Sequence, residues 1–351
     1  MGIGRYEASE IQVFPARGES FKFGDESLSG MEWPTFLDIL EARRRIAPYL
    51  QRTPLRYYHS LSKLLGCEVY VKHEETNPTG AFKVRGGINL ISQLTPEERE
   101  RGVITASTGN HGQSIAYASR LFGVRAIICV PEGANPDKVE AIRSLGAEII
   151  EWGRDFEDAK RNAERLAEEE GYRYIHSGNE PLLIAGVGTI GLEIMEELPD
   201  VDVIIVPVGG GSGASGISIA VKTINPEVEV IGVQSEGAPS VYLSWKRGSI
   251  IETETVETFA DGLATRRAFE LPLEIMREKL DDFILVSDDE IREAIRLYVE
   301  RAHVIAEGAG AAPLAAAVKM RERLKDRKVV LDLTGKNITA EELRSILCRG
   351  V

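Results

Sequence analysis

Four short segments of the chain combine glycine and small hydroxyl residues with a group that can do chemistry. Residues 77–87 read Asn-Pro-Thr-Gly-Ala-Phe-Lys-Val-Arg-Gly-Gly and place Lys83 among small and apolar neighbours. An amine removed from water has a lowered pKa and can form a Schiff base with a carbonyl compound. Since most lysines are simply solvated, this segment by itself predicts only a candidate nucleophile.

The second segment, residues 105–114, reads Thr-Ala-Ser-Thr-Gly-Asn-His-Gly-Gln-Ser and opens a predicted helix. Free N–H groups at a helix N-terminus, together with the helix dipole, suit an anion such as a carboxylate. The alternative interpretation is ordinary helix capping by a residue such as Ser107, with His111 as a capping or solvent-facing side chain.

The third segment, residues 207–216, is the glycine-rich turn Pro-Val-Gly-Gly-Gly-Ser-Gly-Ala-Ser-Gly. Glycines let the main chain close around a phosphate, which the N–H groups and the helix dipole then bind. It is not a P-loop, because the Gly-Lys-Ser/Thr ending is missing. A purely structural turn is one alternative, and a nicotinamide-binding loop at Gly211, Gly213 and Gly216 is another.

The fourth segment, residues 331–337, places the hydroxyl of Thr334 at the exit of the last predicted strand. Nearby, residues 307–312 begin with Glu307 and continue with small residues, which we interpret as helix packing and capping. All four segments lie where a strand gives way to a helix or loop, and α/β sheets bind ligands at that edge.

The elements that position these segments follow an alternating pattern from about residue 68 onward. Alternation of β-branched runs with amphipathic stretches predicts an α/β fold with mostly parallel sheets flanked by helices. The expected strands are 69–71, 103–105, 124–130, 148–150, 172–175, 203–208, 228–233, 283–286 and 329–333. The expected helices include 36–49, 113–122, 136–145, 156–169 and 217–224.

Composition excludes several classes of protein. The chain has 351 residues, and its 55 acidic and 42 basic side chains give a net charge of −13, which argues against nucleic-acid and anionic-membrane partners. No apolar run approaches the roughly 18 residues of a membrane span, and residues 1–7 show no signal peptide. Cys67, Cys129 and Cys348 are too few and too far apart for a disulfide framework, so we expect a cytoplasmic protein.

Together and in this order, the four segments resemble the fold type II pyridoxal-phosphate enzymes, which have a tryptophan synthase β-like fold. Within them the chain is most similar to the threonine/serine dehydratase and serine racemase branch, from about Thr53 to the C-terminus. The resemblance implies pyridoxal 5′-phosphate as cofactor and two domains. The expected division is an N-terminal arm over 1–35, a large cofactor-binding domain over 36–99 and 179–351, and a small substrate-loop domain over 100–178.

The resemblance also implies a role for each segment. Lys83 would hold the cofactor as a Schiff base and then act as base at the substrate Cα, with Phe82 beside the pyridine ring. Asn110 would hydrogen-bond the ring hydroxyl, and Thr334 would meet the pyridine nitrogen. The other implied contacts are to the phosphate from Gly209, Gly210, Gly211, Ser212 and Gly213, and to the substrate carboxylate from Ser107, Thr108, Gly109, Asn110 and His111.

A neutral hydroxyl at the pyridine nitrogen favours prompt loss of a β-substituent over a long-lived carbanion. The implied activity is therefore that of an ammonia-lyase, a dehydratase that converts L-threonine or L-serine to 2-oxobutanoate or pyruvate and ammonia. Threonine synthase or another β- or γ-replacement enzyme, and a serine or hydroxyaspartate racemase or dehydratase, remain alternatives. A nicotinamide-binding Rossmann protein is the alternative from a different class.

Three features depart from the patterns of the resembled enzymes. Lys336 stands where dehydratases have glycine, and Thr108 stands where racemases have a serine that acts as the opposite-face base. Gln234 and Ser240 fall at the acidic positions of the racemase cation site, so we expect no metal. Family habit predicts a homodimer that takes a small amino-acid substrate.

Overall fold

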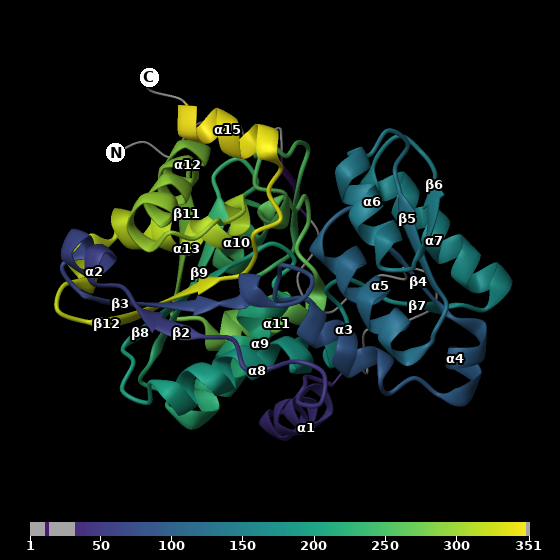
Figure 1. Ribbon diagram of the computed structural model, residues 1–351, viewed down its shortest axis with the longest axis horizontal. Coiled ribbons are helices and arrows are strands. Elements are labelled where there is room, and N and C mark those ends of the chain that lie inside the picture. Colours follow the sequence, from purple (N-terminus) through teal and green to yellow (C-terminus); the bar gives the residue numbers. More distant parts are fainter. Residues whose placement is uncertain (1–10, 14–31, 349–351) are drawn as a thin grey trace.

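Two parallel sheets organise the chain, as the alternating pattern predicts. The computed structural model describes residues 11–13 and 32–348, and Figure 1 shows the two sheets as separate lobes. The larger sheet has the order β11-β9-β8-β12-β3-β2, and all its pairs are parallel except β2 with β3. Its strands are β2 (Leu55–Tyr57), β3 (Glu68–His73), β8 (Val203–Pro207), β9 (Glu229–Ser235), β11 (Asp282–Val286) and β12 (Lys328–Leu333).

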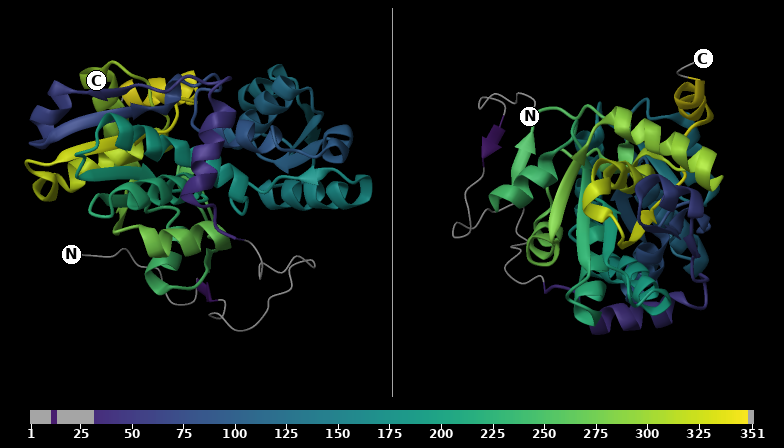
Figure 2. Two further views of the ribbon diagram at one scale, coloured as in Figure 1. Left: turned by 90° about the horizontal axis from the view of Figure 1, so that it is seen from below. Right: turned by 90° about the vertical axis from the view of Figure 1, so that its left-hand side faces the viewer.

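The smaller sheet is wholly parallel, with the order β6-β5-β4-β7. Its strands are β4 (Val103–Ala106), β5 (Ala126–Val130), β6 (Glu148–Glu151) and β7 (Arg173–Tyr174). A further antiparallel pair joins β1 (Ile11–Val13) to β10 (Ile251–Thr253) beside the larger sheet (Figure 2). Apart from β1 and residues 32–35, the predicted N-terminal arm lies outside the described residues.

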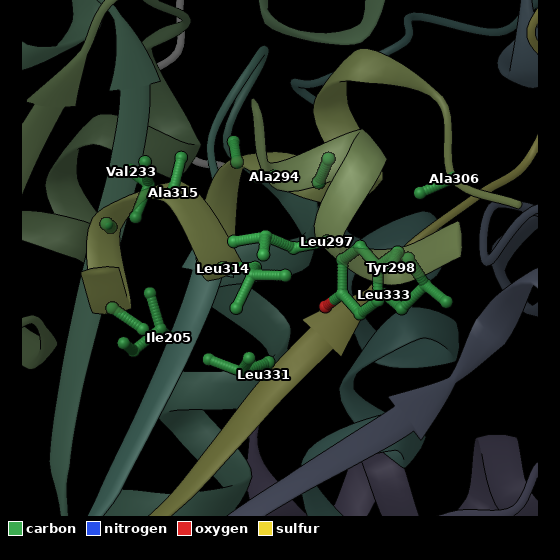
Figure 3. Close-up of a cluster of buried hydrophobic side chains, with 14 of the residues drawn as sticks. Ile205, Val233, Ala294, Leu297, Tyr298, Ala306, Leu314, Ala315, Leu331 and Leu333 are labelled. Atoms are coloured by element: carbon green, nitrogen blue, oxygen red, sulfur yellow. The ribbon is translucent and has the colours of Figure 1, made fainter. Parts of the chain in front are cut away.

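Helices cover both faces of the larger sheet, because its strands carry apolar side chains on both faces. One face packs against α2 (His59–Leu65), α12 (Asp288–Leu297) and α13 (Gly308–Lys319). In Figure 3, Tyr298 and Leu314 pack beside Leu331 and Leu333 of β12 on this face. The other face packs against α8 (Pro181–Glu197), α9 (Ser212–Ile224), α10 (Ser240–Arg247) and α11 (Glu270–Lys279).

The smaller sheet is covered in the same way. Ala159 and Ala163 of α7 (Phe156–Glu170) pack on one face, against a cluster that includes Ile104 and Ile127. The other face meets α5 (Asn110–Phe122) and α6 (Pro136–Ser144). This second cluster continues through α3 (Val84–Ile91) and α1 (Phe36–Ile46) to α8, so apolar packing joins the two lobes.

The predicted elements are confirmed, but several of their ends move. The helix expected over 217–224 begins at Ser212, and the one expected over 113–122 begins at Asn110, because glycine-rich turns lead straight into them. Thirteen residues of the helix α8 are buried, so it has no polar face. Its helical periodicity is therefore not visible in the sequence. The expected division into domains stays a prediction, although the two sheets fall on either side of it.

Candidate active site

The order of the strands brings three of the four segments to one edge of the larger sheet. Strands β8, β12 and β3 are neighbours, and the glycine turn, Thr334 and the Lys83 segment follow their carboxyl ends. Residues 80–82 also pair with 334–336, because Phe82 N donates to Thr334 O at 2.9 Å and Lys336 N donates to Gly80 O at 3.0 Å. The carboxyl edge of a parallel sheet is where α/β proteins bind ligands.

The fourth segment reaches the same place from the smaller sheet. It follows β4 and begins α5, whose Ser114 Oγ donates to the main-chain oxygen of Lys83 at 2.7 Å. The fit is close, because a Cβ added to Gly87 of α3 would meet Ser114. The structure therefore brings all four sequence-predicted segments together.

The amine of Lys83 is held inside this junction. Its Nζ donates to Ser212 Oγ at 2.7 Å and lies 5.2 Å from the centroid of the Phe82 ring. Burial disfavours the charged form and lowers the pKa of Lys83 to about 8. At neutral pH a usable fraction of such an amine is unprotonated, so it can act as a nucleophile or as a base.

The glycine turn between β8 and α9 has no room for side chains. An added Cβ would lie 2.7 Å from the Phe269 ring at Gly210, and 2.6 Å from Met276 Cε at Gly211, whose φ is +89°. At Gly213 it would lie 3.1 Å from the Phe82 ring. Within the described chain, no N–H of residues 209–213 donates to a main-chain oxygen outside α9, so these donors at the helix N-terminus are available to a ligand.

The loop after β4 offers a second set of free donors. Among the described residues, the N–H groups of Thr108, Asn110 and His111 donate to no main-chain oxygen. The first helical residue of α5 is Asn110, so these groups lie at the N-terminus of a helix thirteen residues long. Both the donors and the helix dipole suit a carboxylate there.

His111 is neither exposed nor a cap, contrary to the alternative considered from the sequence. Its ring is buried, and its Nε2 lies 3.0 Å from Thr105 Oγ1, which itself donates to Ile175 O at 2.7 Å. Thr105 therefore accepts from Nε2, which leaves the buried Nδ1 without a hydrogen-bond partner. Burial, and then the neighbouring Lys83 amine, lower the pKa of His111 to about 3, so the ring is neutral. Its side chain cannot supply a positive charge to a substrate.

Glu307 was interpreted from the sequence as packing and capping, and the capping part of that interpretation is wrong. It precedes α13, but its side chain accepts no hydrogen bond from that helix. Instead Oε1 accepts from Asn110 Nδ2 at 2.7 Å, and Oε2 accepts from Asn337 N at 3.2 Å. No sequence signal indicated these contacts, because Asn110 lies 197 positions away from Glu307.

Comparison with known proteins identifies the family. The family model described as "Pyridoxal-phosphate dependent enzyme" matches residues 46–335. The chain belongs to the pyridoxal-phosphate dependent enzyme family. Its cofactor is pyridoxal 5′-phosphate.

Several relatives match over most of the chain. The L-threonine ammonia-lyase of Thermotoga maritima is 44% identical over 90% of this chain and 79% of its own length. The L-threonine dehydratase catabolic TdcB of Escherichia coli strain K12 is 39% identical over 88% of this chain and 94% of its own. Among solved structures, maize serine racemase superposes with a TM-score of 0.86 at 34% identity, covering 90% of this chain and 97% of that one. The processed form of threonine deaminase isoform 2 from Solanum lycopersicum gives a TM-score of 0.85 at 33% identity, over 90% of each chain.

The site fits the family's cofactor on three structural grounds. The turn at 209–213 offers available N–H donors, and a Cβ at its glycines would clash with neighbouring groups, so the main chain can approach a phosphate closely. Lys83 is an enclosed amine of lowered pKa directly beside that turn. Thr334 is buried, and its main-chain oxygen accepts from Phe82 N at 2.9 Å, so this hydroxyl residue lies beside the Lys83 segment at the exit of β12.

The structure also shows where the residues lie that depart from the patterns of the resembled enzymes. Lys336 is exposed, so its charge lies on the surface and not within the site. Gln234 Oε1 accepts from Tyr242 N at 3.0 Å, and Ser240 Oγ donates to Thr265 O, so both side chains bind the main chain. The described residues contain no group of three or more His, Cys, Asp or Glu side chains that could hold a metal ion.

Proposed function

We propose that this protein is a threonine/serine ammonia-lyase, which converts L-threonine to 2-oxobutanoate and ammonia and L-serine to pyruvate and ammonia. The observation that carries the proposal is the neutral hydroxyl of Thr334 beside Phe82, within a family whose matched relatives bear the names threonine ammonia-lyase and threonine dehydratase. The net reaction balances, because the water lost from Cβ is replaced by the water that hydrolyses the released imine.

Pyridoxal phosphate, when bound through Lys83, withdraws electrons from the Cα of the amino acid. In our proposal the amine of Lys83, once free, takes the Cα proton, for which a pKa of about 8 suits work near neutral pH. Ser212 Oγ, 2.7 Å from that amine, holds it at the rim of the glycine turn. The N–H groups of residues 209–213 would bind the phosphate.

Substrate orientation is proposed to come from the N-terminus of α5. The N–H groups of Thr108, Asn110 and His111, with Ser107 and Gly109 shaping the turn, would bind the substrate carboxylate. Ser107 Oγ accepts from Gly109 N at 3.2 Å, which braces this turn. Holding the carboxylate at the helix N-terminus would fix the orientation of Cα, so that the Cα–H bond faces the free amine of Lys83.

Release of keto acid by the holoenzyme tests the proposal directly. We expect 2-oxobutanoate from L-threonine and pyruvate from L-serine, each with one equivalent of ammonia. Threonine formed from phosphohomoserine faster than any keto acid would instead identify a replacement enzyme. A result with neither product from any of these substrates would overturn the assignment.

Thr334→Asp tests the reason given for the reaction type. A carboxylate beside the pyridine nitrogen keeps that nitrogen protonated and makes the ring a stronger electron sink. We expect keto-acid release to fall at least about tenfold and racemisation of serine to rise, with Thr334→Ser close to the unmodified enzyme. Chiral chromatography of recovered serine measures the change, and an unaltered ratio of elimination to racemisation would contradict the role of Thr334.

Serine racemase is the second candidate, because maize serine racemase superposes with a TM-score of 0.86. The residue that would act as the second base in a racemase is Thr108, which is partly exposed in the turn before α5. Thr108→Ala separates the two functions. Racemisation by Thr108 would be lost in this variant, whereas elimination would remain.

We also propose that the protein is a homodimer and that it is located in the cytoplasm. The three cysteines form no disulfide, which suits a reducing compartment, and no helix among the described residues could span a membrane. Light scattering on the eluting holoenzyme should give about twice the 38.6 kDa of the chain.

A further inference from the structure

Glu307 and Asn337 lie where the two sheets meet, and both contact Asn110. Glu307 precedes α13 and Asn337 follows β12 in the larger lobe, whereas Asn110 begins α5 in the smaller one. Glu307 accepts from Asn110 Nδ2 at 2.7 Å and from Asn337 N at 3.2 Å. The packing is close, because a Cβ on Gly335 would meet Glu307 Oε1.

These contacts determine which way the Asn110 amide points. Asn337 Nδ2 donates to the Thr79 oxygen at 2.9 Å and to Asn110 Oδ1 at 2.7 Å, which uses both of its hydrogens. Asn110 must therefore present oxygen to Asn337 and nitrogen to Glu307. One N–H of Asn110 is then bound to Glu307, and the second N–H is left as a donor of fixed direction.

Among the residues that the structure describes, no ion pair is formed by Glu307. The charge of Lys138 of α6 lowers the pKa of Glu307 only as a minor cause, and Lys138 is itself ion-paired with Asp261 of η2 (Asp261–Leu263). Burial raises the pKa of Glu307 to about 7, although hydrogen bonds from Asn110 and Asn337 lower it. A poorly solvated carboxylate whose partners are amides costs stability. The burial and hydrogen bonds of Glu307 therefore point to a positioning role rather than to a contribution to folding.

We propose that Glu307 and Asn337 are positioning residues that fix the Asn110 amide so that its free N–H is available to the ring hydroxyl of the cofactor. The inference deepens the proposed function, because it rests on Asn110 as the partner of that hydroxyl. These hydrogen bonds also join the two lobes, since Asn110 comes from the smaller one and Glu307 and Asn337 come from the larger one.

The test measures cofactor binding and cofactor absorption rather than turnover. Apoprotein is prepared from the holoenzyme and titrated with pyridoxal phosphate, and the unfolding temperature of each apoprotein is recorded. The variants are Glu307→Gln, which keeps the size of the side chain, and Asn337→Ala. The matched control is Glu342→Gln, because Glu342 lines the same small cavity as Glu307 but bonds to Thr339.

We expect Glu307→Gln and Asn337→Ala to weaken cofactor affinity about tenfold and to shift the absorption maximum of the bound cofactor. The Glu307→Gln apoprotein should unfold at the same or a higher temperature, and Glu342→Gln should leave affinity and absorption unchanged. In an Asn110→Ala background, Glu307→Gln should have no further effect on affinity, because both residues act through one amide.

Two results would overturn the inference. One is a lower unfolding temperature with unchanged affinity and absorption, which would make Glu307 a purely structural residue. The other is an effect of Glu307→Gln on affinity that persists in full without Asn110. Neither result depends on keto-acid release, so a failure of the proposed reaction is distinguishable from a failure of this inference.

Discussion

At the scale of single residues, Lys83 and Ser212 form a close polar contact in the proposed site. The amine of Lys83 donates to Ser212 Oγ at 2.7 Å, and burial lowers its pKa to about 8. Lys336 can be compared with Lys83. It follows β12, four residues after the buried Asp332, but its own side chain is exposed. Two lysines of nearby motifs thus have opposite environments, and only one is suited to covalent chemistry.

Lys83→Ala should abolish covalent attachment of the cofactor. Turnover should fall at least about 100-fold, because the variant lacks both the attachment point and the proposed base. Borohydride reduction of the unmodified holoenzyme followed by peptide mapping should find the cofactor on Lys83. Lys336→Ala serves as control and should retain attachment, and a reduced adduct on Lys336 would refute the assignment.

At the scale of elements, the turn between β8 and α9 shows why the glycine run cannot be replaced. Gly210 lies against the ring of Phe269, and that ring in turn contacts His176 edge-to-face with centroids 4.8 Å apart. The Phe269 ring therefore packs against the turn at Gly210. A side chain at Gly210 would displace this ring or the turn itself.

Gly210→Val should weaken affinity for pyridoxal phosphate at least about tenfold, since the new Cβ would start 2.7 Å from the Phe269 ring and the donors would move. Ser218→Ala is the matched control on the same helix, where Ser218 Oγ donates only to Ser215 O. Equilibrium titration of both apoproteins measures the difference. Equal affinities would show that the turn does not bind the phosphate.

A buried ion-pair cluster holds the helix α3, which begins directly after Lys83. Arg85, two residues on, donates to Glu74 at 2.7 Å and to Glu193 at 2.7 Å, and Lys72 Nζ donates to Glu193 at 2.6 Å. These side chains come from β3, the turn after it, α3 and α8. All four are almost fully buried, so removal of one charge leaves the others uncompensated.

Arg85→Met should lower the free energy of unfolding by about 3–5 kcal/mol, because two buried carboxylates lose their main partner. Arg125→Met is the comparison, since Arg125 pairs with Glu148 at 2.7 Å between two half-exposed side chains and its loss should cost less than about 1 kcal/mol. Urea unfolding of the apoproteins measures both values. Similar losses in the two variants would contradict the stabilising role of the Arg85 cluster.

At the scale of the whole molecule, the buried His111 and the half-buried His176 make stability depend on pH. His176 Nδ1 accepts from Gly178 N at 3.0 Å and from Asn179 N at 2.9 Å, an arrangement that requires a neutral ring. Burial, the largest cause, lowers the pKa of His176 to about 4 and that of His111 to about 3. Both rings lie in the smaller lobe, on segments that reach the larger one.

The apoprotein should lose stability as pH falls from about 6.5 to about 4. In that window the unfolded chain binds protons at these histidines and the folded chain does not. The stabilisation of the folded chain by the two neutral rings is therefore complete above the unfolded pKa and is lost on acidification. Each histidine should lower the free energy of unfolding by up to about 1.4 kcal/mol for each pH unit of acidification in this window. Urea unfolding at several pH values should show a shallower dependence in His176→Gln, and an identical slope would contradict this account.

The amino-acid sequence determined the residues of the proposed site and the class of the fold. Residues 209–213, Lys83 and Asn110 lie in segments that follow predicted strands, and strand and helix periods are local properties of the chain. Their order along the chain sufficed to predict a pyridoxal-phosphate enzyme, which the family match confirms.

Only the tertiary structure decided which of these groups contact one another. The neighbouring positions of β8, β12 and β3 bring together segments more than 100 residues apart, and strand order depends on long-range pairing that no local pattern records. The same holds for Glu307, which the sequence suggested only as packing and capping, and for His111, whose ring turns inward to Thr105. A side chain's partner and solvation arise from packing across the lobes, so its role could be determined only once the chain had folded.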